Sequence, residues 1–478
     1  MQKVKKVISV VLCVLLISSL LIPCVSAADE EKNYIIDNPY DVIDWDSWNA
    51  YKTQLHAHTN ASDGFLTIHE FVQEHYDRDY DIVALTDHGT VNYGWNQEPD
   101  LVTIMRLVKY ERTQNSDIIP LTEEEYAAYL GGTAESDTRT HSNGMLDVPY
   151  GNELNFATPF ADCHLTSYFA PYGQGDPGVF GDYETPAANV AALDGVTMLS
   201  HVGEYVYIDK DSEKYVGQPV DDYYASKFAR IFLDNPGSSL GMGINSATDA
   251  HTRCDRILYD QVLAKTIPNG VVPWGFTFSD SHTADSVNYA YTMTMMDSFD
   301  IDTFRESMEN GLFFSVSHFT NGVELNGMAE MPGYVEEEMD YESNDTPMVT
   351  RIEVDQDNDT ITVEGINFDM ITWVSGGNVI LRQENITDGK ATLDLHSDEL
   401  LDEPYMFVRF YIVGEDGICY SNPMVLNVEG ETFENVDVPE TKDISTFLRK
   451  VLNFFNDMIF SKSVFVDIFK KTMLGIDD

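Results

Sequence analysis

Short motifs of histidine and aspartate follow three apolar runs, and they constrain this chain more than any other feature. Residues 51–55, 82–86 and 272–279 have the composition of strands, and each is followed directly by such a motif. The motifs are His56-Ala57-His58, Asp87-His88 and Asp280-Ser281-His282. Side chains at positions i and i+2 leave the same face of a strand, so such a pair can reach one metal ion. Three strand-end motifs therefore predict a metal site with several ions, and hence a hydrolase.

Residues 51–320 alternate short apolar runs with helical patterns. Helices are expected over residues 67–79, 187–193, 223–233 and 248–265, and further strands over residues 196–200 and 274–279. At the start of the first helix, Thr67 and Glu70 have the spacing of a capping box. Such alternation predicts an α/β fold over residues 28–346, in which helices cover a parallel sheet or barrel.

Two stretches of this region, residues 89–147 and 202–271, are longer than simple connections require. We expect both to be insertions at the rim of the active site, where long loops shape specificity. From residue 347 the chain changes to short β-rich runs separated by Gly, Asn and Asp, which predicts a C-terminal β-sandwich over residues 347–428. Residues 429–478 are expected to form an acidic linker and an amphipathic helical tail.

The first 27 residues have the three parts of a secretory signal peptide. Lys3, Lys5 and Lys6 are basic, residues 7–22 are apolar, and Val25-Ser26-Ala27 fits a small-x-small cleavage site. We therefore predict an exported protein that is extracellular or associated with the cell envelope. An uncleaved membrane anchor and lipid attachment at Cys24 are the alternatives.

The chain is strongly acidic, with 80 aspartates and glutamates against 28 lysines and arginines and a formal net charge of −52. A negative field of this size repels polyanions, and binding to a nucleic acid polymer needs a track of basic residues. We therefore expect no polymeric nucleic acid as a partner. A small anionic substrate is compatible with this charge, because bound metal ions can dominate the potential near them.

Seven short motifs, in this order, resemble those of the PHP (polymerase and histidinol phosphatase) metallohydrolases over residues 51–320. They are His56-x-His58-Thr59, Ser62-Asp63-Gly64, Leu85-Thr86-Asp87-His88-Gly89, Gly151-Asn152-Glu153, His164, Leu199-Ser200-His201 and Ser279-Asp280-Ser281-His282. Residues 407–411 and 420–424 are similar to the closing strands of a secreted or carbaryl-hydrolase-like branch of these proteins. The resemblance implies a distorted TIM-like (β/α)7 barrel that binds two to three divalent metal ions.

Carried over residue by residue, the resemblance implies nine metal ligands in three groups. The groups are His56, His58, Glu153 and Asp280 for the first ion, Glu153, His164 and His201 for the second, and Asp63, His88 and His282 for the third. Mixed imidazole and carboxylate ligands suit manganese, zinc or ferrous iron. Glu153 would bridge two ions, and a bridging water, acidified toward hydroxide, would be the nucleophile. Glu153 and Asp280 are the expected catalytic carboxylates.

Three further residues are candidates for the site. Asp87 stands beside a predicted ligand, and it could cap a turn or support a metal-bound imidazole. His251 and Arg253 lie within one of the predicted rim insertions, where an arginine could clamp a phosphate of the substrate. An ion pair at the surface of an acidic protein is the alternative for this arginine.

These observations predict an exported metal-dependent hydrolase. The activity they favour is that of a phosphoesterase that acts on a small molecule such as a nucleotide or sugar phosphate. A carbamate or carboxylic ester hydrolase could use the same metal site, and a non-catalytic surface-binding protein is the second alternative. Residues 443–474 carry an unusual density of basic side chains for this chain, which would allow peripheral contact with a membrane or the envelope. Packing of this tail against the protein's own core is the other interpretation.

Overall fold

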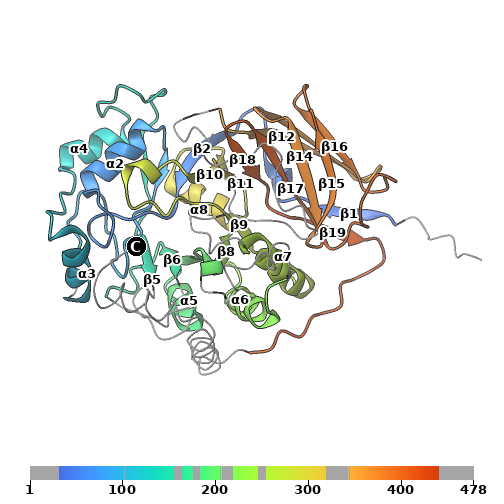
Figure 1. The fold of residues 1–478 in the computed structure, drawn as a ribbon, viewed down its shortest axis with the longest axis horizontal. Coiled ribbons are helices and arrows are strands. Elements are labelled where there is room, and N and C mark those ends of the chain that lie inside the picture. Colours follow the sequence, from blue (N-terminus) through green and yellow to red (C-terminus); the bar gives the residue numbers. More distant parts are fainter. Residues whose placement is uncertain are drawn as a thin grey trace, which may run out of the picture.

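The computed structural model describes residues 32–440, apart from residues 102, 155–163, 176–182, 205, 207–218, 246–253, 319–342 and 344. The predicted signal peptide, the predicted helical tail, His251 and Arg253 lie outside the described residues. Among the helices that the structure describes, none is both long and apolar enough to cross a membrane. Helices α2, α3 and α4 lie at one end of the molecule, and the C-terminal strands gather at the other (Figure 1).

The largest sheet has eleven strands and joins the two ends of the described chain. Its order is β1 (Tyr34–Asp37), β19 (Met424–Val428), β17 (Phe407–Gly414), β18 (Gly417–Tyr420), β11 (Phe313–Ser317), β10 (Ala290–Met296), β2 (Asn49–Gln54), β3 (Ile82–Val83) and β4 (Leu146–Asp147), with β14 (Met370–Ser375) and β15 (Asn378–Glu384) extending from β17. Strands β2, β3 and β4 are parallel to one another, so β2 and β3 end at the same edge of the sheet. The motifs that follow them therefore lie side by side.

A second sheet contains β5 (Asn152–Leu154), β6 (Leu165–Tyr168), β7 (Val196–Leu199), β8 (Ser239–Gly243) and β9 (Trp274–Phe276) in sequence order. Only β6 runs antiparallel to its neighbours. Two isolated bridges join this sheet to the first, one between His88 and Glu153 and one between Ala57 and Ser281. Both bridges lie among the histidine and carboxylate motifs, so the seams between the two sheets meet at the candidate site.

The inner faces of these two sheets share one apolar core. Leu55, Ala84, Tyr168, Met198 and Phe278 belong to a single buried cluster, although they come from five different strand regions. Tyr168 also donates a hydrogen bond across this core to the backbone carbonyl of Leu55. Over the residues that the structure describes, hydrogen bonding does not close these strands into one continuous barrel. The α/β class is confirmed in this coarse form, and a closed (β/α)7 barrel stays a prediction.

Residues 202–271 are not only an insertion, as we had expected from the sequence. They contain β8, which lies between β7 and β9 in the second sheet, together with α6 (Asp222–Asp234) and α7 (Asp255–Thr266). The sequence of β8, Ser-Leu-Gly-Met-Gly, lacks the β-branched side chains that mark a strand. Gly241 is needed there because a Cβ atom would lie 2.0 Å from the carbonyl oxygen of Trp274 on β9.

The C-terminal strands form a second layer. Strands β12 (Met348–Asp355), β13 (Thr360–Ile366) and β16 (Lys390–Asp394) make a separate sheet in which buried and exposed residues largely alternate. Ile361 and Val363 of this sheet pack in the same buried cluster as Trp373 and Phe410 of the largest sheet. One layer is thus continuous with the strands that carry the metal-site motifs. A self-contained β-sandwich over residues 347–428 stays a prediction, as does a domain boundary at residue 346.

The remaining helices are α2 (Ile68–Asp77), α3 (Thr103–Thr113), α4 (Glu123–Leu130), α5 (Glu184–Ala192) and α8 (Ile301–Glu309). The predicted capping box at the start of α2 is confirmed, since Thr67 accepts a hydrogen bond from the Glu70 amide and Glu70 accepts one from the Thr67 amide. Two of the helices, α3 and α4, lie within residues 89–147 and cover the same end of the molecule as α2 (Figure 1).

Candidate metal centre

The nine predicted ligands all come together at one end of the strands. His56 and His58 follow β2, His88 follows β3, Glu153 lies in β5, His201 follows β7, and Asp280 and His282 follow β9. His164 immediately precedes β6, which runs antiparallel, so its amino end lies at the same edge as the carboxyl ends of its neighbours. Asp63 comes from the loop between β2 and α2. This convergence fits the tendency of functional groups to gather at the carboxyl ends of parallel strands.

Glu153 lies at the centre of the cluster and is fully buried. One of its carboxylate oxygens, Oε1, lies 3.2 Å from His56 Nε2, 2.9 Å from His164 Nδ1 and 3.3 Å from His201 Nε2. The other, Oε2, lies 3.2 Å from His58 Nε2 and 2.9 Å from His88 Nδ1. A carboxylate that faces five imidazoles with both oxygens is placed to contact more than one cation.

Asp280 is a second carboxylate in contact with His56 and His58. Its Oδ1 atom is 3.2 Å from His56 Nε2 and 3.1 Å from His58 Nε2, and its Oδ2 atom is 3.8 Å from His201 Nε2. The backbone of Asp280 has a φ of 50°, in the left-handed region, and its amide donates to the carbonyl of His56 at 3.0 Å. The hydrogen bond across the seam thus fixes this carboxylate beside the histidines of β2.

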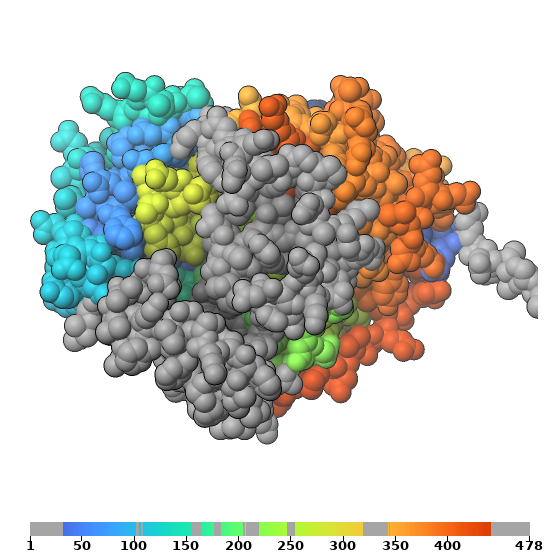
Figure 2. All heavy atoms as spheres, in the orientation of Figure 1, coloured from blue at the N-terminus to red at the C-terminus, as the bar shows by residue number. Residues whose placement is uncertain are grey.

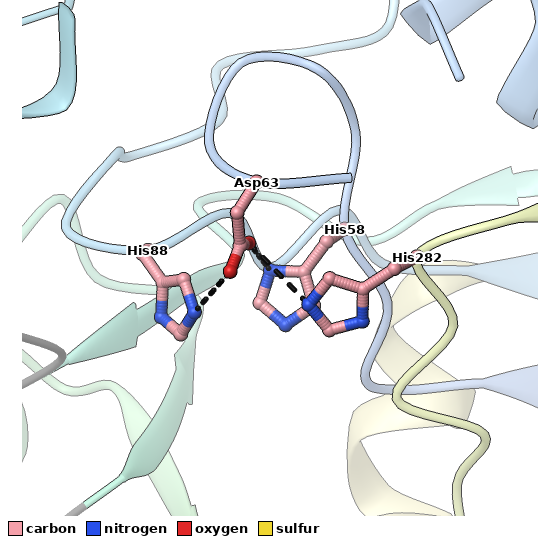
Figure 3. A group of neighbouring side chains, drawn as sticks. All are labelled: His58, Asp63, His88 and His282. Carbon is pink, nitrogen blue, oxygen red and sulfur yellow. Dashed lines mark ion pairs between the residues drawn. The ribbon is translucent and has the colours of Figure 1, made fainter. Parts of the chain in front are cut away.

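Asp63 holds a third part of the cluster together. It reaches from its loop into a group of three histidines, His58, His88 and His282 (Figure 3). Its carboxylate oxygens lie 3.4 Å from His282 Nε2, 3.5 Å from His88 Nε2 and 3.7 Å from His58 Nδ1. The ligand atoms of these four residues lie within 4.8 Å of one another, so the group could hold one metal ion.

The donor atoms fit metal ions better than they fit hydrogen bonds. His56 Nε2, His58 Nε2, Asp63 Oδ1, Asp280 Oδ1 and both oxygens of Glu153 are buried and make no hydrogen bond to the described residues. Leaving a buried polar atom without a hydrogen bond costs about 1–3 kcal/mol, and more if it is charged. Several such atoms that face a common space are what a set of metal ligands requires. The residues present therefore fit a group of divalent ions.

Burial and the neighbouring charges shift the pKa values of these groups in opposite directions. Burial raises the pKa of Glu153, but the contacts with His164, His56 and His88 outweigh it and hold this pKa well below its usual range. For His88, burial lowers the pKa, yet Asp63 and Glu153 outweigh it and raise the pKa to about 9. The carboxylates of the cluster are therefore held in the anionic form that binds cations.

Two neighbouring hydroxyl groups orient the histidines of β2. Thr86 Oγ1 lies 2.8 Å from His56 Nδ1, and Ser62 Oγ lies 3.4 Å from His58 Nδ1. Each contact uses the ring nitrogen that faces away from Glu153, so the other nitrogen stays directed at the centre of the site. Sequence reasoning did not single out these two hydroxyls, although both stand within the quoted motifs.

Asp87 acts on the loop that carries Asp63. Its carboxylate accepts hydrogen bonds from the Thr59 amide at 2.8 Å, from Thr59 Oγ1 at 2.7 Å and from Ser62 Oγ at 2.6 Å. Its position thus resembles the turn cap that the sequence suggested as one alternative. Support of an imidazole is indirect, through the contact of Ser62 with His58.

The structure brings the ligand atoms into four overlapping groups, whereas the sequence suggested three. The four groups are His58, Asp63, His88 and His282; His56, His58 and Glu153; His56, His201 and Asp280; and His88, Glu153 and His164. His201 joins His56 and Asp280 in one group, and it also lies beside His164 at Glu153 Oε1, as we expected, while His88 contributes to two groups. Such sharing depends on the seam between the sheets, for which the sequence has no local signal. The assignment of ligands to individual ions stays a prediction.

No family model and no curated protein matches the chain, but several solved structures resemble it weakly. A two-domain protein from Bacteroides vulgatus, described as containing a predicted PHP-like metal-dependent phosphoesterase, is 11% identical, with a TM-score of 0.38 and coverage of 79% of this chain and 96% of that chain. The lesion-specific endonuclease EndoQ from Pyrococcus furiosus is 11% identical, with a TM-score of 0.30 and coverage of 54% of this chain and 56% of the other. An amidohydrolase from Chromobacterium violaceum is 14% identical, with a TM-score of 0.27 and coverage of 49% of this chain and 89% of the other. At these TM-scores we draw no conclusion about activity from the likeness.

Proposed function

We propose that this protein is a metal-dependent hydrolase that cleaves phosphoesters in small molecules, such as nucleotides or sugar phosphates. The observation that carries the proposal is the convergence of nine histidine and carboxylate side chains into four overlapping groups around Glu153. A purely structural ion seldom needs so many overlapping ligands, whereas hydrolases that activate water use two or three neighbouring ions. Manganese, zinc or ferrous iron suits these donors.

The side chains of the cluster would have different roles in such a reaction. Divalent ions, when bound, polarise the substrate and lower the pKa of a bound water to near neutrality. Glu153 presents one oxygen to the His164 side and the other to the His88 side, so it would keep two cations close together. Among the candidate ligands, His282 has the largest exposed side-chain fraction, 33%, whereas Asp63 and Asp280 are 14% and 16% exposed. Substrate would therefore approach over His282.

The partners and the location that we propose follow from the sequence. The surplus of acidic residues supports a small substrate over a nucleic acid polymer, because a polyanion would be repelled. The signal-peptide pattern of residues 1–27 supports export to the envelope or the medium, and the basic residues of 443–474 support peripheral contact with an anionic surface.

Metal-reconstituted protein tests the main proposal. The chain from residue 28 would be stripped with a chelator, reloaded with manganese, and incubated with nucleotides, sugar phosphates and aryl carbamates while product release is followed. We expect phosphate release that disappears when His56 and His58 are both replaced by alanine. His69→Ala is the matched control, because His69 lies on α2 and is not among the grouped ligands.

Three outcomes would contradict the proposal. Undiminished hydrolysis by the His56→Ala/His58→Ala variant would show that the cluster is not the catalytic site. Turnover of aryl carbamates without any phosphate release would keep the metal site but replace the substrate class with carbamates or carboxylic esters. Absence of both activities, with metal bound, would favour a binding protein.

A further inference from the structure

An exposed phenylalanine stands next to the candidate metal centre. Phe65 is 56% exposed, although it is separated from Asp63 by a single glycine. Its backbone amide donates a hydrogen bond of 2.8 Å to the carbonyl of His282, so two ligand-bearing segments meet at this residue. On the face shown in Figure 2, the yellow-green segment that follows β9 lies directly against the blue residues of the N-terminal part.

The loop that carries Phe65 is held rigidly. The amide of Asn60 donates to the carbonyl of Leu66 at 2.7 Å, and the amide of Gly64 donates to the carbonyl of Thr59 at 3.0 Å. The loop folds back so closely on the residues that follow β2 that a Cβ atom on Gly64 would be 2.4 Å from the carbonyl oxygen of His58. The exposure of Phe65 is therefore a property of a fixed backbone, and it does not come from a loosely packed loop.

The backbone of Phe65 is hydrogen-bonded to the most exposed of the candidate ligands. His282, whose carbonyl accepts the Phe65 amide, has a side chain that is 33% exposed, whereas those of His56 and His58 are fully buried. A molecule that reaches the cluster from solvent over His282 thus passes the segment that holds Phe65. Single exposed apolar residues are common on protein surfaces, so exposure alone would mean little. The informative combination is exposure, a fixed backbone and a backbone hydrogen bond to the most exposed ligand residue.

We propose that Phe65 determines specificity by stacking on an aromatic group of the substrate, the nucleobase or aryl part of a phosphoester, while the phosphate lies at the metal cluster. This inference rests on the proposed function and makes it narrower, because a simple alkyl or sugar phosphate offers no ring to stack on. Stacking on an exposed aromatic side chain contributes about 1–3 kcal/mol, which corresponds to roughly 5- to 150-fold in kcat/KM.

Paired substrates would test this inference. The kcat/KM values for phenyl phosphate and for glycerol phosphate would be measured with manganese-loaded wild-type protein and with Phe65→Ala, Phe65→Trp and Tyr405→Ala. We expect Phe65→Ala to lower kcat/KM about 5- to 150-fold for phenyl phosphate and to leave glycerol phosphate unchanged, and Phe65→Trp to preserve the preference. Tyr405→Ala is the matched control, since Tyr405 is 59% exposed but belongs to the C-terminal strand region.

A binding measurement separates this inference from the proposed function. Calorimetry would compare phenylphosphonate with methylphosphonate, which are not hydrolysed, on the same variants. A phenyl preference that Phe65→Ala abolishes would support the role of Phe65 even if no phosphoester is turned over. An equal loss for both ligands, or an unchanged preference in Phe65→Ala, would overturn it.

Discussion

Removal of either partner of the buried ion pair between Arg409 and Asp260 should strongly destabilise the folded protein. Arg409 Nε and Nη2 donate to the two carboxylate oxygens of Asp260 at 2.8 and 2.7 Å, and each side chain is only 2% exposed. The pair joins β17 to α7, and so connects the C-terminal strands to a helix beside the second sheet. Removing one partner of such a pair costs about 3–5 kcal/mol, because the remaining charge stays buried without its counter-ion.

We therefore expect Arg409→Met and Asp260→Leu each to lower the free energy of unfolding by about 3–5 kcal/mol, and the double variant to lose less than either single variant. Urea unfolding followed by tryptophan fluorescence, with chelator present, would measure these values. Lys390→Met, which removes the exposed pair with Glu364, is the control and should show no resolved change. A loss below ~1 kcal/mol for Arg409→Met, or additive losses in the double variant, would refute the reasoning.

Three further changes test the site and the packing around it. Glu153→Gln should reduce the metal content of reloaded protein, measured by mass spectrometry, from two or three ions per chain to one or none, whereas Glu124→Gln should not. Gly64→Ala should weaken metal affinity about 10- to 100-fold by displacing the loop that carries Asp63, and an unchanged affinity in a metal titration would contradict this. Burial lowers the pKa of His75 from 6.5 to about 3, so unfolded His75 takes up a proton below about pH 6.5 while the folded form does not. Between these pH values, His75 should therefore lower the free energy of unfolding by about 1.4 kcal/mol for each unit by which the pH is lowered. In urea titrations, His75→Leu should flatten this slope, but His69→Leu should not.

Local patterns of the sequence predicted the parts of the structure that depend on neighbouring residues. The ligand motifs follow strands, and Thr67 and Glu70 form the expected capping box, because both features are settled within a few positions of the chain. The same local motifs contain each of the nine candidate ligands. What the motifs could not indicate is which side chains share an ion.

Features that depend on distant residues were missed. Strand β8 has two glycines and no β-branched residue, and it is a strand because Gly241 lets β9 approach closely. The pairing of β1 with β19 joins residues separated by almost the whole described chain, and no local pattern can predict such a partner. The same holds for β11 and β18, whose pairing joins strands from the two sides of the predicted domain boundary at residue 346.

A metal ion bound at the seam between the two sheets would connect residues of both sheets. His56, His58 and His88 follow strands of the largest sheet, whereas Glu153, His164, His201, Asp280 and His282 belong to or flank strands of the second sheet. Each of the four ligand groups takes members from both sides. An ion in any of these positions would therefore act as a cross-link between the two sheets, and its binding energy would add to the free energy that holds them together. Amide hydrogens at the two seam bridges should exchange faster after chelation than those inside either sheet, so that the candidate metal centre would also stabilise the contact between the sheets.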